Sequence, residues 1–155
     1  MGKVELKDYT LLRCDALWRQ YVQDPMMSCE PYSYDPAWVK SYHARICSDK
    51  SRYVFAVCLD NEVIGEAQIK RIDNEKRCGT LSLILANDRF KNRGFGRCAL
   101  QKLIGYAFDT LNLLTIYADC TARNSRSAHL MESEGFAFVC EKDAMRYYVL
   151  KRKPE

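Results

Sequence analysis

The sequence contains no apolar run that approaches the roughly 20 residues of a membrane-spanning helix. Its first ten residues, Met1 to Thr10, alternate charged and apolar side chains and lack the apolar stretch of a signal peptide. Lys and Arg number 24 against 20 Asp and Glu, a surplus too small and too scattered to indicate nucleic-acid binding. These absences predict a cytoplasmic protein that contacts neither a membrane nor a nucleic acid.

Metal-binding patterns are also missing. The chain has only two histidines, and none of its eight cysteines stands in the two-residue spacing of a zinc site. We therefore expect no metal ion. Cysteines such as Cys58 and Cys140 fall inside apolar runs, which predicts reduced and buried thiols.

The composition is sufficient for one folded domain. The chain has 155 residues, 48% of them hydrophobic, and no repeat or linker divides it, so we expect a single domain over residues 1–155. Apolar spacing predicts helices over residues 12–22, 36–48, 97–111 and 125–134. Apolar runs predict strands over residues 3–6, 53–59, 63–70, 80–86, 114–118, 137–140 and 146–150. In the second helix, Asp35 is the expected N-cap before Pro36, and Trp38, Tyr42 and Ile46 share the apolar face.

A basic loop, Asn87 to Arg97, separates the strand at 80–86 from the longest helix. It holds two glycines, and the basic side chains of Lys91, Arg93 and Arg97 can add charge-assisted hydrogen bonds to an anion. A strand, a glycine-containing loop and a helix N-terminus direct several backbone N–H groups toward one point, where the helix dipole also favours negative charge. The loop therefore predicts a pyrophosphate site.

Two other interpretations of this loop remain open. One is a solvated basic turn closed by its glycines. The other is the dinucleotide fingerprint of an oxidoreductase, formed by Gly94, Gly96 and Ala99 with Asp119 about 20 residues further on. Against the fingerprint, residues 87–93 separate the strand from Gly94, whereas a Rossmann strand runs almost directly into its first glycine.

The segment Lys91 to Gly96 resembles the signature of the GNAT family of N-acetyltransferases, which reads Gln or Arg, two residues, Gly, one residue, then Gly or Ala. Lys91 stands where Gln or Arg is usual, which keeps a donor but loses the planar one. Downstream, Asn124 and the pair Gly135-Phe136 look like the start and end of the next helix of the family. The similarity spans nearly the whole chain, and residues 24–38 resemble the branch of ribosomal-protein N-terminal and spermidine acetyltransferases.

The resemblance implies an α/β (α+β) fold in which a mixed, mostly antiparallel sheet splays at its centre and is flanked by helices. It also implies that acetyl-CoA binds in the splay as co-substrate, and that a backbone N–H there polarises the thioester carbonyl. The residues implied to bind coenzyme A are Leu83, Ile84, Leu85, Lys91, Asn92, Arg93, Gly94, Phe95, Gly96, Arg97 and Asn124.

The resemblance also bears on the general acid and the general base. Met131 occupies the position of the tyrosine that many GNAT proteins use as general acid, and a thioether cannot donate a proton. The ribosomal-protein branch implies Ser127 as the acid instead, although a helix-opening serine is the structural alternative. Glu66, the acid nearest the expected active-site strands, is the candidate base. Direct attack with proton loss through water is the alternative.

The resemblance thus implies transfer of an acetyl group to a primary amine of a peptide N-terminus, a polyamine or a small molecule. A non-catalytic acyl-CoA-binding module is the alternative that Met131 favours. Homodimers are common in this branch. The aromatic side chains that either line the acceptor pocket or fill the core are Tyr32, Tyr34, Trp38 and Tyr42.

Overall fold

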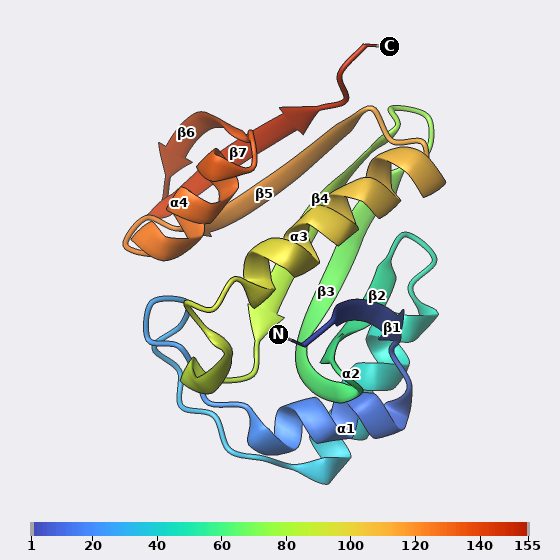
Figure 1. The fold of residues 1–155 in the computed structure, drawn as a ribbon, viewed down its shortest axis with the longest axis vertical. Coiled ribbons are helices and arrows are strands. Elements are labelled where there is room, and N and C mark those ends of the chain that lie inside the picture. Colours follow the sequence, from blue (N-terminus) through green and yellow to red (C-terminus); the bar gives the residue numbers. More distant parts are fainter. Residues whose placement is uncertain (1, 155) are drawn as a thin grey trace.

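The computed structural model describes residues 2–154, and the strands in that range form one sheet in the order β1-β2-β3-β4-β5-β7-β6 (Figure 1). Neighbouring strands pair antiparallel except β4 and β5, which are parallel. The predicted mixed, mostly antiparallel sheet is therefore confirmed. The strands are β1 (Val4–Asp8), β2 (Tyr53–Leu59), β3 (Glu62–Asp73), β4 (Cys78–Leu85), β5 (Thr115–Thr121), β6 (Ala137–Lys142) and β7 (Met145–Lys151).

Helices flank the sheet, as predicted. In Figure 1, α3 crosses in front of β3 and β4, α4 lies beside β5 and β7, and α1 and α2 lie together at the lower end of the sheet. The connection through α3 allows β4 and β5 to run parallel, because parallel strands need a crossover of this kind. The helices are α1 (Leu11–Gln20), α2 (Pro36–Ser48), α3 (Phe95–Gly105) and α4 (Ser125–Ser133).

The sheet splays between β4 and β5. These strands pair only at Cys78–Thr115, Gly79–Ile116 and Thr80–Tyr117. Beyond Thr80, β4 continues to Leu85 and β5 continues to Thr121 without pairing to each other. We call the gap between residues 81–85 of β4 and 118–121 of β5 the wedge, and its inner end at Thr80 the apex. The predicted splay is confirmed.

The α2 helix begins where its cap predicts. The Asp35 carboxylate accepts a hydrogen bond from the Ala37 backbone N–H at 3.0 Å, and Pro36 opens the first turn. The predicted apolar face is only partly correct, since Val39 and Ile46 are its buried residues whereas Trp38 is 41% exposed. The Trp38 ring instead stacks on Tyr42 at the edge of this face, with ring centroids 4.8 Å apart.

The α3 helix buries the predicted side of its surface through Leu100 and Leu103, and the turn that follows it buries Ala107. The predicted helix over 97–111 differs at both ends. It begins at Phe95, because Gly94 adopts a left-handed conformation with φ of 84° and serves as N-cap. The α-helix ends at Gly105, and the predicted residues beyond it, Tyr106–Thr110, form a π-helical turn that apolar spacing alone does not reveal.

All eight cysteines are free thiols. Cys58 is buried as predicted, but the same prediction for Cys140 is wrong, because β6 is an edge strand whose six residues are all exposed. Within residues 2–154, no group of three or more His, Cys, Asp or Glu side chains is placed to hold a metal ion. No helix in the same range is long and apolar enough to cross a membrane.

Candidate active site

A cavity of about 270 Å³ lies in the wedge. Its walls come from strands β3, β4, β5 and β7, from helices α3 and α4, and from the loop between α1 and α2. The lining residues are Met27, Lys70, Leu81, Ser82, Leu83, Leu100, Ala118, Asp119, Cys120, Thr121, Asn124, Ser127, Leu130, Met131 and Met145. The mixed polar and apolar lining is typical of a small-molecule site.

Three predicted site residues meet in this cavity: Leu83 of β4, Asn124 at the N-cap of α4, and Ser127 of α4. Asn124 is buried and caps α4, since its Oδ1 accepts from the Ser127 backbone N–H at 3.1 Å. The Ser127 hydroxyl makes no hydrogen bond to any residue that the structure describes, so it is free to act on a bound molecule. Met131 is buried in the same wall, where it offers no proton donor.

The basic loop at residues 87–97, called the glycine loop below, lies at the outer end of the wedge. A Cβ added to Gly96 would lie 3.7 Å from Leu85 Cδ1 on β4 and 4.0 Å from Leu130 Cδ2 on α4. Gly96 therefore leaves the wedge mouth open between these two side chains. Gly94, the N-cap of α3, has no side chain that could accept from the first-turn N–H groups. Because the first-turn N–H groups of an α-helix have no intrahelical partner, the start of α3 presents donors at this mouth.

The basic side chains of the loop differ in how much charge they offer. Lys91 is 11% exposed, and its Nζ pairs with Asp24 at 2.9 Å and with Asp88 at 3.2 Å. The Arg97 guanidinium pairs across the wedge mouth with the carboxylate of Glu134, the C-cap of α4, at 2.9 Å. Arg93 forms no ion pair with a described residue, and its guanidinium lies 4.9 Å from the centroid of the adjacent Phe95 ring. The uncompensated positive charge is therefore that of Arg93, while Lys91 mainly holds the loop against the α1–α2 connection.

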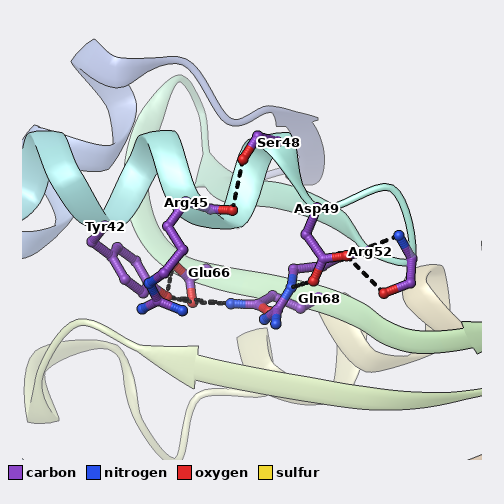
Figure 2. A network of polar contacts seen from close by, with 8 residues as sticks. Tyr42, Arg45, Ser48, Asp49, Arg52, Glu66 and Gln68 are labelled. Carbon is purple, nitrogen blue, oxygen red and sulfur yellow. Dashed lines mark hydrogen bonds and ion pairs between the residues drawn. The ribbon is translucent and has the colours of Figure 1, made fainter.

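Glu66 lies in a buried polar network on the α2 side of the sheet (Figure 2). The Tyr42 hydroxyl donates to the Glu66 carboxylate at 2.9 Å, and Gln68 Nε2 donates to it at 2.8 Å. Arg52 donates to Gln68 Oε1 at 2.6 Å and pairs with Asp49 at 3.1 Å. Burial raises the pKa of Tyr42 far above its usual range, and the Glu66 charge raises it further, so Tyr42 remains a donor to Glu66.

The family model described as acetyltransferase (GNAT) domain matches residues 3–137. The chain belongs to the GNAT family. It is 25% identical over 135 residues to a spermidine N(1)-acetyltransferase of Vibrio cholerae serotype O1, which covers 80% of this chain and 78% of that protein. It is 34% identical over 86 residues to the N-acetyltransferase p20 of Bacillus licheniformis, which covers 56% of this chain and 48% of that one.

A solved spermidine N-acetyltransferase chimera from Vibrio cholerae and hSSAT superposes on this GNAT chain with a TM-score of 0.84 at 18% identity, over 97% of this chain and 96% of the chimera. This likeness confirms the fold. The match to the family model and the similarity to a named N-acetyltransferase confirm the predicted family and the predicted enzyme class, N-acetyltransferase. The dinucleotide alternative does not fit the GNAT sheet, since β4–β5 is its single parallel pair within residues 2–154.

In this GNAT site, Glu66 does not line the wedge cavity, whereas Lys70 does, although Glu66 and Lys70 lie on the same strand. Lys70, Ser82 and Met27 of the α1–α2 loop also line the cavity, and none of them was predicted as a site residue. A signal for Lys70 was available, because polar residues at 66, 68 and 70 alternate along an otherwise buried strand. No local sequence pattern placed Met27 in the cavity lining, because its loop is held near the wedge by a tertiary hydrogen bond from the Thr121 hydroxyl to the Met26 carbonyl.

Proposed function

We propose that this chain transfers the acetyl group of acetyl-CoA to a primary amine. The observation that carries the proposal is the wedge, a cavity with the glycine loop at its mouth and an unpaired strand edge along one wall. The first-turn amides of α3 and the Arg93 guanidinium would bind the pyrophosphate. Backbone groups of Leu83, Ile84 and Leu85 face no β5 partner, so a pantetheine arm can pair with them as an added strand.

The proposed chemistry needs one electrostatic contact and two proton movements. A β4 backbone N–H polarises the thioester carbonyl as negative charge develops on its oxygen. The neutral amine then attacks and the carbon–sulfur bond breaks. Ser127 donates its hydroxyl proton to the leaving thiolate and regains a proton from water. Glu66 remains the candidate base. The proton that the amine loses must reach it through the Tyr42 hydroxyl or through water, because the Glu66 carboxylate does not line the cavity.

The acceptor is proposed as a primary amine of a peptide N-terminus, a polyamine or a small molecule. Spermidine is the first amine to test, because a spermidine N(1)-acetyltransferase is among the relatives. The assay follows release of the coenzyme A thiol from acetyl-CoA with spermidine, a short unblocked peptide and propylamine in turn. Release that depends on at least one amine supports the proposal. Binding of acetyl-CoA without amine-dependent release from a broad panel would contradict it.

Replacing Ser127 with alanine is expected to lower kcat about 100-fold, because a positioned general acid contributes at least this much. The dissociation constant for acetyl-CoA should not change, since the hydroxyl acts on the leaving sulfur. Ser125→Ala is the matched control, because Ser125 lies exposed in the same first turn of α4 and outside the cavity lining. Equal kcat values for the two variants, measured by thiol release, would remove Ser127 from the mechanism.

A further inference from the structure

Lys70 occupies the apex of the wedge. On β3 it pairs with Thr80 of β4, and Thr80 is the last β4 residue that pairs with β5. Its side chain lines the cavity together with Ser82 and Asp119. The cavity therefore carries a primary amine of the protein itself at its inner end.

The donor would present its thioester to this end. The glycine loop lies at the opposite end, where Gly96 faces Leu85. A coenzyme whose phosphates bind at the loop must direct its pantetheine arm inward along β4 toward Thr80. The acetyl group at the tip of that arm then approaches the apex, where the Lys70 amine lies.

The Lys70 side chain has no hydrogen-bond or ion-pair partner among the residues that the structure describes, although it is half-buried. Lys91 shows the contrasting arrangement, since its Nζ is neutralised by Asp24 and Asp88. A lysine held in a cavity without a carboxylate partner keeps its amine available for reaction.

The electrostatic surroundings favour the reactive form of Lys70. Burial lowers the pKa of Lys70 below its ordinary value, and the positive charges of Arg71 and Arg52 lower it further, while Asp119 and Glu66 oppose the shift. A larger fraction of this amine is therefore neutral near pH 7 than for an exposed lysine. The neutral amine is the nucleophile that attacks a thioester.

We propose that Lys70 is a self-acetylation site, which takes the acetyl group from acetyl-CoA in the wedge when no acceptor amine is bound. This inference rests on the proposed function, because the donor must occupy the wedge. The Nζ lone pair attacks the thioester carbonyl carbon, a carbon–nitrogen bond forms and the carbon–sulfur bond breaks. The proton lost from Nζ passes through water to the thiolate, which leaves as coenzyme A thiol.

The modification has a consequence for turnover. Acetylation removes the positive charge of Lys70 and places an amide at the apex. Because an amide does not return its acetyl group to a second amine, the modified chain is blocked where acceptor and donor must meet. A chain held with acetyl-CoA and no acceptor should therefore lose activity as Lys70 becomes modified.

The test incubates the whole chain with acetyl-CoA and no amine, and follows acetylation of individual lysines by peptide mass spectrometry. Acetylation of Lys70 should saturate with acetyl-CoA concentration and should run at least about 100-fold faster than that of Lys102 at low concentration, because the reactants share one cavity. Lys102 is exposed on α3 and reports the reaction of lysine with acetyl-CoA from solution. Lys70→Arg should lose the saturable modification, and Lys102→Arg should keep it.

Two further measurements identify the modified residue and establish whether acetyl-CoA binds. The Cys120 thiol lines the same cavity, and hydroxylamine removes a thioester from Cys120 but leaves an amide on Lys70. Calorimetric titration with acetyl-CoA is run on the same sample. Acetyl-CoA binding with Lys70 modified no faster than Lys102 would overturn the self-acetylation site alone. Absence of binding would overturn the proposed function together with it.

Discussion

A Gly96→Trp variant is expected to bind acetyl-CoA at least about 100-fold more weakly than the natural chain, which corresponds to about 2.7 kcal/mol of binding free energy. The reason is the position of Gly96 at the wedge mouth. A Cβ there points between Leu85 and Leu130 at ordinary contact distances of 3.7 and 4.0 Å. An indole continuing in that direction fills the path between the glycine loop and the cavity. Calorimetric titration with acetyl-CoA measures the loss.

The matched control is Gly105→Trp. Gly105 ends the same helix, and a Cβ added there meets no atom within 4 Å, so the same indole projects into open space away from the wedge. This variant should bind acetyl-CoA as the natural chain does. Urea unfolding checks that both variants remain folded, so that a loss of affinity is not a loss of structure. Equal affinities of the two variants would mean that acetyl-CoA does not enter past Gly96.

Replacing Glu66 with alanine is expected to lower the free energy of unfolding by about 3 kcal/mol, because it removes the shared acceptor of a buried network. The Tyr42 hydroxyl would then lose its acceptor, and Gln68 Nε2 would keep only its 3.3 Å hydrogen bond to that hydroxyl. Each donor left without an acceptor in a buried site costs about 1–3 kcal/mol before any relaxation. Glu66→Gln keeps the volume and one acceptor oxygen, so its loss should be smaller. Urea unfolding followed by tryptophan fluorescence measures both changes.

Glu62→Ala provides the control on the same strand. Glu62 pairs with Arg89 at 3.1 Å, but both side chains are more than half exposed, so the loss should stay below about 1 kcal/mol. Equal stability of the Glu66→Ala and Glu62→Ala variants would show that the network does not hold α2 on β3. A folded Glu66→Gln variant also separates roles, because thiol release falls if Glu66 is the base and persists if Glu66 only positions Tyr42.

Much of the fold follows from local patterns in the sequence. The cap at Asp35 and Pro36 predicts the start of α2, and the apolar period predicts the buried side of α3. The family signature also directs attention to the loop at Gly94 and Gly96, which the structure places at the wedge mouth. These features depend on residues close together in the chain, so a single sequence contains the information.

Other features depend on contacts between distant segments. The neutralisation of Lys91 requires Asp24, which lies 67 residues earlier and approaches it only in the folded chain. The inclusion of Lys70 in the cavity follows from where β4 and β5 stop pairing, which strand composition does not specify. The burial of Glu66 likewise depends on Tyr42 of α2. Charge and position indicated Lys91 and Glu66 but not Lys70, and the pairing of elements determines what each of the three side chains contacts.

The most direct test of the acetyl-CoA site is calorimetric titration of the natural chain with acetyl-CoA, with NAD as the comparison ligand. We expect saturable binding of acetyl-CoA at one site per chain and no binding of NAD. That result would support the wedge as an acyl-donor site and justify the search for the acceptor amine. Binding of NAD, or no binding of acetyl-CoA, would contradict the assignment of the wedge as an acetyl-CoA site.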